Sequence, residues 1–285
     1  MSDVKKVGVV GGGTMGSGIV QVFAQADHEV TLLEASEALL DKAWGRLKSA
    51  LSKLVDRGKL SAEESEKTLA RIHRTTDPKA FASADLVVEA IFEDEKTKVE
   101  LLNRLAPVLK PDAILASNTS SISITKLARH SGRPDRFIGM HFFNPVPVMK
   151  LVEVIRGLAT SQSTFQTVMD TAVSLGKTPV EVHDYPGFVS NRILLPMINE
   201  AVFCLHEGVA SREAVDTVMK LGMNHPMGPL QLADFIGLDV CLDILNVLYE
   251  GFRDPKFRPC PLLSKMVAAG YLGRKSGKGF YDYPA

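Results

Sequence analysis

The segment KVGVVGGGTMGSGIVQVFAQADHEVTLLE, residues 6–34, carries the strongest information about the fold. Its first five residues form an apolar run bounded by glycine, which predicts a buried parallel strand. Residues 16–26 have helical spacing, and residues 29–35 predict a second strand. Between the first strand and the helix, GGGTMG at residues 11–16 satisfies the pattern G-x-G-x-x-G. This order of elements predicts a dinucleotide-binding βαβ unit, whereas a glycine turn without that context would indicate only flexibility.

Each residue of the motif has an expected role. Gly11 allows the tight turn, Gly13 lets the backbone approach a pyrophosphate, and Gly16 lets the helix pack closely on the strand. Thr14 and Met15 open the helix, whose first N–H groups would face the phosphates.

Glu34 closes the second strand, 23 positions after Gly11. A carboxylate at this point binds the ribose hydroxyls of NAD and repels the 2′-phosphate of NADP. We therefore expect NAD as the cofactor.

The rest of the chain divides into two parts with different patterns of predicted secondary structure. Strands are predicted at 84–91, 113–117, 136–143, 151–155 and 178–183, with helices around 95–107 and 163–175, which indicates an α/β sheet. From residue 186 onward the pattern is helical. The predicted fold class is a Rossmann-type dinucleotide-binding sheet, residues 1–185, followed by an all-α C-terminal domain, residues 186–285. That second domain would cover the sheet's crevice as a substrate cleft or pair with itself.

Residues 36–58 form a helical insertion that is too long for a simple crossover. Four leucines share one predicted face, namely Leu40, Leu47, Leu51 and Leu54. Four cations gather on the far side, namely Lys42, Arg46, Lys53 and Arg57. This stripe predicts either a site for a phosphorylated substrate or an ordinary solvated face.

Composition excludes several classes of function. Lys+Arg and Asp+Glu are both 33, so the net charge is zero, which argues against general nucleic-acid binding. The three cysteines lack metal-ligand spacing, so no metal site is expected. No signal-peptide pattern and no run of about 20 apolar residues is present, so we expect a cytoplasmic protein without membrane association.

The segment HFFNPVPVMKLVEVI, residues 141–155, places a glutamate inside an apolar run. His141 ends a strand late in the sheet, where ligands of open α/β sheets bind, and histidine is the usual base for alcohol oxidation. If the turn brings the two strands side by side, Glu153 would accept the imidazole N–H and fix its tautomer. The alternative is that Glu153 is a solvated residue at the rim.

Six segments together resemble the L-3-hydroxyacyl-CoA dehydrogenase family over nearly the whole chain. They are GGGTMGSGIVQVFAQADHEV, ASNTSS, HFFNPVPVMKLVEV, PGFVSNR, PMGPLQLADFIGLD and KSGKGFYDY. The resemblance implies NAD-dependent interconversion of an (S)-3-hydroxyacyl-CoA, expected to be 3-hydroxybutyryl-CoA, and the 3-oxoacyl-CoA. It also implies that His141 is the base, that Glu153 orients it, and that Ser120 and Asn191 contact the substrate oxygens.

The same resemblance extends to the cofactor, coenzyme A and the assembly. Glu93, Lys98, Asn144 and Lys275 match the family's cofactor-contacting positions. The family uses the helical insertion to bind coenzyme A, which favours Lys53 and Arg57 as phosphate contacts. It further implies a homodimer formed through the C-terminal domain.

Two other functions stay open at this stage. One is a related dehydrogenase of a non-CoA hydroxy or sugar acid such as L-gulonate, which would need no cationic stripe. The other is a non-catalytic NAD-binding structural protein, which would not need Ser120, His141, Glu153 and Asn191 together.

Overall fold

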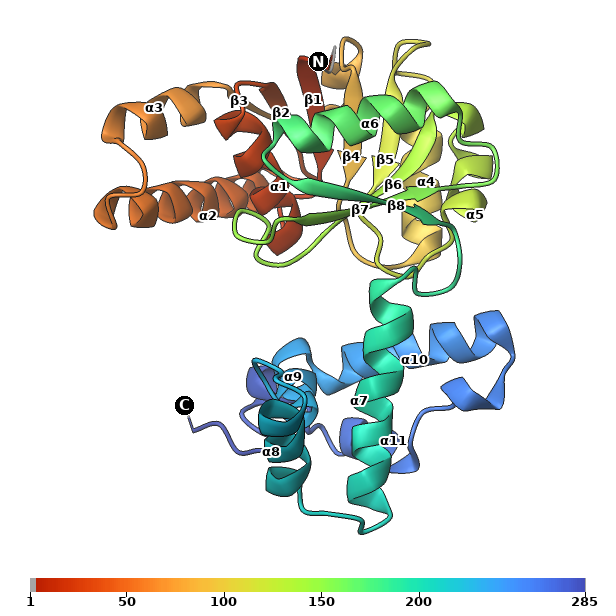
Figure 1. Ribbon diagram of the computed structural model, residues 1–285. Helices are drawn as coiled ribbons and strands as arrows, with labels where there is room; N and C mark the ends of the chain where they lie inside the picture. The colour runs from red at the N-terminus through yellow and green to blue at the C-terminus, as the bar shows by residue number, and fades with distance from the viewer. Residues whose placement is uncertain (1–3, 285) are drawn as a thin grey trace. The chain divides into compact units, whose positions relative to one another are not determined.

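The structure is a computed structural model that describes residues 4–284, and it divides into two compact units. Residues up to Asp184 form an α/β unit, and residues from Tyr185 onward form a helical unit (Figure 1). The predicted fold class is confirmed.

One eight-stranded sheet organises the α/β unit, in the order β3-β2-β1-β4-β5-β6-β7-β8. The strands are β1 Lys6–Val10, β2 Glu29–Leu33, β3 Ile72–Thr75, β4 Leu86–Glu89, β5 Ile114–Ser117, β6 Phe137–Phe142, β7 Leu151–Arg156 and β8 Thr178–His183. Strands β1 to β6 are parallel, whereas β7 is antiparallel to β6 and parallel to β8. The carboxyl ends of six strands therefore lie along one edge of the sheet.

Helices cover both faces of this sheet. They are α1 Thr14–Gln25, α4 Glu95–Leu105, α5 Ile124–His130 and α6 Gln162–Ser174. Helices α2 Glu37–Asp56 and α3 Ala62–Ala70 extend beyond the β3 edge of the sheet (Figure 1). Met140 of β6 lies in the core cluster that contains residues of α1 and α6. A Cβ added to Gly139, its neighbour on the strand, would lie 2.9 Å from Ile124 Cδ1 of α5. Since adjacent strand residues point to opposite faces, α5 covers the face away from α1 and α6.

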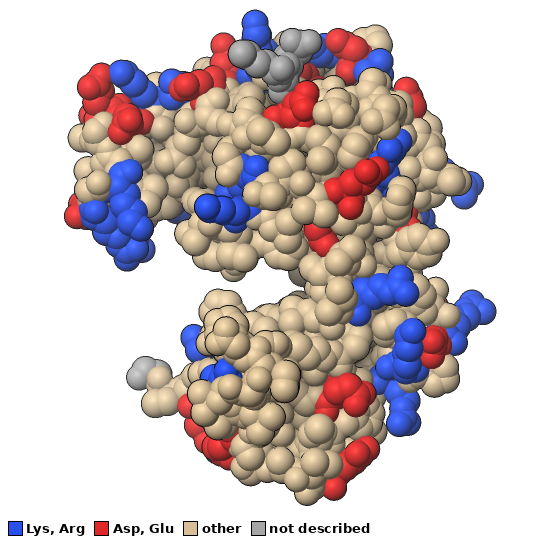
Figure 2. Space-filling model, viewed as in Figure 1, with Lys and Arg blue, Asp and Glu red and all other residues tan. Residues whose placement is uncertain are grey.

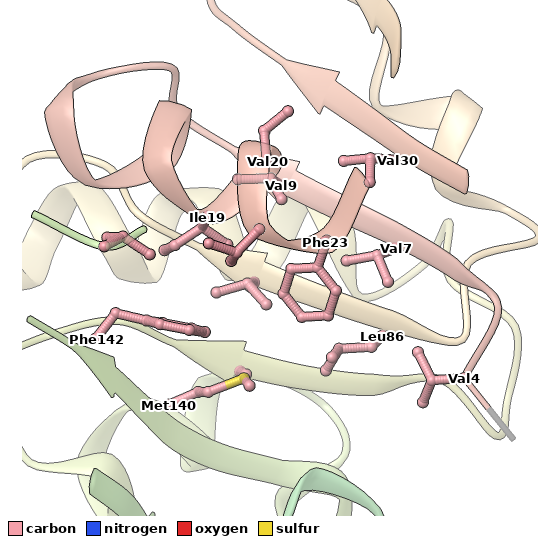
Figure 3. Packing of buried hydrophobic residues seen from close by; sticks show 14 of the residues in the cluster. Val4, Val7, Val9, Ile19, Val20, Phe23, Val30, Leu86, Met140 and Phe142 are labelled. Carbon is pink, nitrogen blue, oxygen red and sulfur yellow. The ribbon is translucent and has the colours of Figure 1, made fainter. Parts of the chain in front are cut away.

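One layer of the core of this unit lies between α1, α6 and the sheet. Figure 3 shows Phe23 and Ile19 of α1 among Val7, Val9 and Leu86 of the central strands. Phe23 and Ile19 have no exposed surface. Burial of such side chains stabilises a fold by about 1.5–3 kcal/mol each, so this layer fixes the helix that follows the glycine turn.

The helical insertion is longer than residues 36–58. Helix α2 occupies most of that range, with Ser36 as its N-cap, and α3 follows with a capping box formed by Ser61 and Glu64. The predicted apolar face of α2 is largely confirmed, because Leu40, Leu47 and Leu51 are buried. Leu54 is only half-buried.

The second unit is helical and has its own core. Its helices are α7 Ser190–His206, α8 Arg212–Gly222, α9 Pro229–Ile236, α10 Leu238–Phe252 and α11 Pro261–Ala268. Two buried carboxylates organise it: Asp216 accepts the N–H groups of Leu230 and Gln231 at the start of α9, and Asp234 accepts those of Phe280 and Tyr281. No helix among residues 4–284 is both long enough and apolar enough to cross a membrane.

Replacement of Asp184 by Ala should destabilise the α/β unit. Its carboxylate accepts hydrogen bonds from the Ser123 hydroxyl at 2.7 Å and from the N–H groups of Ile124 at 3.1 Å and Thr125 at 2.7 Å. Donors left without an acceptor cost about 1–3 kcal/mol, so the thermal unfolding midpoint should fall by several degrees. As a control, Asp170→Ala removes a carboxylate that accepts only a local bond from Gln166; equal losses in the two variants would contradict the capping role.

Candidate functional site

The glycine turn after β1 leaves an open anion site. Gly11 has φ +94°, and a Cβ added there would lie 2.7 Å from the Ala90 carbonyl oxygen. A Cβ added to Gly16 would lie 1.7 Å from the Gly11 carbonyl oxygen, so α1 packs too closely for any side chain. By contrast, a Cβ added to Gly13 would meet nothing within 4 Å, and no side chain caps α1. The first N–H groups of α1, at Thr14 and Met15, therefore fit a pyrophosphate approaching past Gly13.

Glu34 lies directly beside this turn. One of its carboxylate oxygens accepts the N–H of Gly12 at 2.5 Å, and the other accepts the N–H of Ala35 at 3.2 Å. The half-buried side chain is thereby held at the end of β2, next to the glycine turn. The donors of the turn and this acid together fit the phosphates and a ribose of a dinucleotide.

An open cleft lies between α2 and the segment that follows β6. Its cationic side is formed by Arg46, Lys53 and Arg57, and its opposite side by residues 144–148. Lys42, the fourth cation of the predicted stripe, is exposed and does not line the cleft. Figure 2 shows basic side chains gathered at the end of the α2–α3 insertion.

Arg46 has a structural contact that sequence reasoning missed. Its guanidinium donates a hydrogen bond to the Gly12 carbonyl oxygen at 2.7 Å. This bond connects the insertion to the glycine turn, so the position of the cleft relative to the turn is fixed. Only the position of Arg46 on the cationic face hinted at a function.

His141 and Glu153 are directly opposed on the antiparallel strands β6 and β7. The imidazole Nδ1 lies 2.8 Å from a carboxylate oxygen of Glu153, and the ring of Phe143 lies 4.6 Å from the imidazole centroid. The Glu153 side chain is 3% exposed and that of His141 is 10% exposed. Glu153 is therefore a buried partner of the histidine and not a solvated rim residue, since a buried carboxylate needs such a donor.

Ser120 lies in the segment that follows β5. Its N–H donates to the carboxylate of Glu93 at 2.9 Å, and the neighbouring Thr119 hydroxyl donates to the same oxygen at 2.5 Å. Asn118 accepts the N–H of Phe142 at 2.9 Å, which ties this segment to the strand of His141. Burial by itself would raise the pKa of Glu93, but the Lys98 charge and the Thr119 hydroxyl outweigh it and lower that pKa below its ordinary value.

Lys98 is buried beneath Glu93. Its ammonium lies 3.2 Å from Glu93 and 2.6 Å from Glu89, the last residue of β4. The second Glu89 oxygen accepts the hydroxyl of Ser117 at 2.6 Å. Sequence reasoning selected Glu93 and Lys98 but missed Glu89, although an acid closing the apolar strand LVVE is the signal that identified Glu34.

A buried lysine holds the segment between β6 and β7. Lys177 donates to the carbonyl oxygens of Val146 at 2.5 Å and Met149 at 2.9 Å. Burial lowers the pKa of this ammonium. Asn144, which begins the segment with a cis peptide bond to Pro145, lines the cleft. Nothing in the local sequence pattern indicated the role of Lys177.

The other predicted site residues belong to the helical unit. Asn191 lies in the first turn of α7 and is 9% exposed. Lys275 forms an ion pair with Asp239 at 2.6 Å. Within the α/β unit, the structure brings the remaining predicted residues to the carboxyl edge of the sheet and the cleft. Among residues 4–284, no group of His, Cys, Asp and Glu is arranged to hold a metal ion.

Two family models together match nearly the whole chain. The family model for the NAD-binding domain of 3-hydroxyacyl-CoA dehydrogenase matches residues 6–185, and that for the C-terminal domain matches residues 187–283. A Deinococcus radiodurans protein named "Probable 3-hydroxybutyryl-CoA dehydrogenase" is 59% identical over 98% of this chain and all of its own. The 3-hydroxybutyryl-CoA dehydrogenase of Bradyrhizobium diazoefficiens is 51% identical over 98% of this chain and 96% of its own.

A solved structure extends the comparison to three dimensions. The crystal structure of (S)-3-hydroxybutyryl-CoA dehydrogenase from Ralstonia eutropha superposes with a TM-score of 0.98 at 50% identity. The match covers 99% of this chain and all of the other.

The position of Glu34 predicts a preference for NADH over NADPH in kcat/KM. The carboxylate repels a 2′-phosphate, so Glu34→Gln should narrow the NADH:NADPH ratio by about threefold to thirtyfold while an acceptor for the Gly12 N–H is retained. Steady-state kinetics with both cofactors measures the ratio. Glu37→Gln, an exposed acid in the first turn of α2, is the charge-matched control. If Glu34→Gln leaves the NADH:NADPH ratio of kcat/KM unchanged, the assignment of Glu34 to the ribose would be contradicted.

Proposed function

The chain belongs to the 3-hydroxyacyl-CoA dehydrogenase family, an NAD-dependent group of oxidoreductases, and from this premise we propose its substrate and the roles of its residues. The reaction is (S)-3-hydroxybutyryl-CoA + NAD⁺ ⇌ acetoacetyl-CoA + NADH + H⁺. The observation that carries the proposal is the buried pair of His141 and Glu153 at the carboxyl edge of a dinucleotide-binding sheet.

His141 acts as the base in alcohol oxidation. Its Nδ1–H donates to Glu153, which places the basic lone pair on Nε2. Nε2 takes the hydroxyl proton of the substrate and returns it in the reducing direction. Bound NAD⁺ supplies the hydride acceptor. Glu153 stabilises the imidazolium that forms, and Ser120 and Asn191 hold the substrate oxygens by hydrogen bonds.

The cofactor is held by groups distributed along the chain. Gly11, Gly13, Thr14, Met15 and Gly16 form the pyrophosphate site, which the open side of Gly13 and the uncapped helix support. Glu34 holds a ribose, which its place beside Gly12 supports.

Four further residues complete the proposed cofactor contacts, namely Glu93, Lys98, Asn144 and Lys275. Ionised Glu93 at the carboxyl edge, with Lys98 beneath it, supports the first two. Asn144 is supported by its exposed place at the start of the segment that follows β6. Lys275 rests on the family resemblance.

Coenzyme A occupies the cleft beside α2. Lys53 and Arg57 bind its phosphates, and among residues 4–284 neither has a carboxylate within 4 Å. A non-CoA hydroxy acid such as L-gulonate would have no use for these cations, so the cleft favours the acyl-CoA substrate.

The helical unit supplies the dimer contact. Apolar side chains on and around α8 are exposed, including Val209 at 69%, Val218 at 60% and Leu221 at 82%. Exposed apolar groups clustered in this way mark protein interfaces, and a second copy of the chain is the proposed partner. A cytoplasmic location is also proposed, and the three free cysteines, Cys204, Cys241 and Cys260, support it.

His141→Gln should lower kcat for acetoacetyl-CoA reduction by about 10²–10⁴-fold, the usual cost of losing a general acid or base. The dissociation constant of NADH should stay within a few-fold, because the histidine acts on the substrate. Glu153→Gln should also lower kcat, since the imidazolium loses its anionic partner. His73→Gln, an exposed histidine on β3, is the control. A His141→Gln enzyme with normal kcat would remove this residue from the mechanism.

Replacement of both Lys53 and Arg57 by Ala should raise KM for acetoacetyl-CoA about threefold to thirtyfold, since each exposed charge contact contributes about 0.2–1 kcal/mol. KM for NADH should change little, and added salt should shrink the effect. For an acetoacetyl-pantetheine thioester, which lacks the nucleotide portion, the double replacement should leave KM nearly unchanged. Lys42→Ala/Lys59→Ala removes two exposed cations outside the cleft as a matched control. Equal losses on both substrates would show that the stripe is structural.

A further inference from the structure

The strand order fixes a path across the carboxyl edge of the sheet. Strands β4 and β5 lie between β1, which leads into the glycine turn, and β6, which carries His141. Three strand spacings of about 4.8 Å separate β1 from β6. On the proposed function, a dinucleotide whose pyrophosphate sits on α1 must extend its nicotinamide half over the ends of β4 and β5 to meet a substrate at His141.

The segments after β4 and β5 adjoin both ends of this path. The Ala90 carbonyl oxygen lies 2.7 Å from the position of an added Cβ on Gly11, at the glycine turn. Asn118 accepts the N–H of Phe142, next to the proposed base. The residues that end β4 and β5, Glu89 and Ser117, are therefore beneath the nicotinamide half of the path.

Glu89 is a buried carboxylate whose hydrogen-bond partners are all donors. It is 1% exposed, and it accepts the ammonium of Lys98 at 2.6 Å, the N–H of Ile91 at 2.8 Å and the hydroxyl of Ser117 at 2.6 Å. The Ser117 hydroxyl oxygen itself accepts the N–H of Thr119, so its proton is directed to Glu89. All three partners are donors, as an ionised carboxylate requires.

The cluster of Glu89, Lys98 and Glu93 carries a net negative charge. One ammonium lies between two carboxylates, which gives a formal charge of −1. Glu89 and Lys98 are each 1% exposed in their side chains, whereas Glu93 is 36% exposed. The charges of Glu89 and Lys98, the buried pair, cancel each other. The remaining negative charge therefore resides on the accessible carboxylate of Glu93.

We propose that Glu89 is a positioning residue which cancels the Lys98 charge, so that Glu93 presents net negative charge to the nicotinamide and favours NAD⁺ over NADH. The oxidised ring is cationic and the reduced ring is neutral, so a carboxylate acting in a low dielectric distinguishes them. Without Glu89, Lys98 would neutralise Glu93, and this discrimination would disappear.

The test is the binding of both cofactors to Glu89→Gln in the absence of acyl substrate. Trp44, the single tryptophan, follows Ala43, which lies against Gly12, so tryptophan fluorescence provides a binding signal. The dissociation constant of NAD⁺ should rise about threefold to thirtyfold, while that of NADH should change by less than about twofold. Equal weakening of both, or an unchanged ratio, would overturn the proposal, because a purely structural role moves the two constants together.

Three further variants make the result specific. Glu89→Gln/Lys98→Met restores the net charge of −1, and its NAD⁺:NADH ratio should return toward that of the native protein. Asp85→Asn removes a carboxylate paired with Lys110 at the opposite end of β4, and it should leave the ratio unchanged. If Glu89→Gln does not fold, Glu93→Gln removes the same charge from the accessible side, and an unchanged ratio there overturns the proposal.

These measurements are independent of the proposed reaction. Failure of the acetoacetyl-CoA assay with intact cofactor binding would refute the proposed substrate and leave the charge proposal to be judged by the ratio. Normal catalysis with an unchanged ratio in Glu89→Gln would refute only the role of Glu89.

Discussion

The reversal of chain direction between β6 and β7 is the constraint on which the site depends. Six parallel strands bring their carboxyl ends to one edge, and only a strand that returns antiparallel can begin at that edge. Opposed residues of an antiparallel pair point to the same face, so the register alone places Glu153 against His141. The start of β8 and the residue before it stabilise this return, because Thr178 and Lys177 donate to the carbonyl oxygens of residues 146, 149 and 150. A one-residue slip would move the glutamate to the other face and leave the histidine without its partner.

Three acids near the carboxyl edge follow one physical rule. A carboxylate removed from water is stable only when donors surround it, and each acid here has its own set of donors. Glu34 accepts two backbone N–H groups, one of them from the glycine turn. Glu89 accepts an ammonium, a hydroxyl and a backbone N–H, and Glu153 accepts the imidazole N–H. Each acid also restricts the position of the groups that donate to it. The glycine turn, Lys98 and His141 therefore each have a defined geometry.

The sequence predicted those features that depend on local pattern. The glycine turn, the apolar face of α2 and the fold class follow from spacing within short windows, and the structure has them. Strand β3 and helix α3 were missed because IHRT alternates weakly and AEESEKTLA is mostly polar. Glu153 could not be assigned from the residues alone, since its burial depends on the register of two strands. The contacts of Lys177 and Arg46 were missed for a related reason, because their partners are 28 to 34 residues distant in sequence.

Short connections link the two proposed nucleotide sites of the α/β unit. Arg46 fastens α2 to the glycine turn, and Lys53 and Arg57, on the same cationic face, line the cleft. The opposite side of that cleft is the segment that follows β6, and Lys177, the residue before β8, holds it. A shift of α2 would therefore alter the glycine turn and the cleft together, whereas a shift of residues 144–149 would alter the cleft and strand β6, which carries His141. Variants that change affinity for one nucleotide alone must then act through a side chain and not through the backbone of these connections.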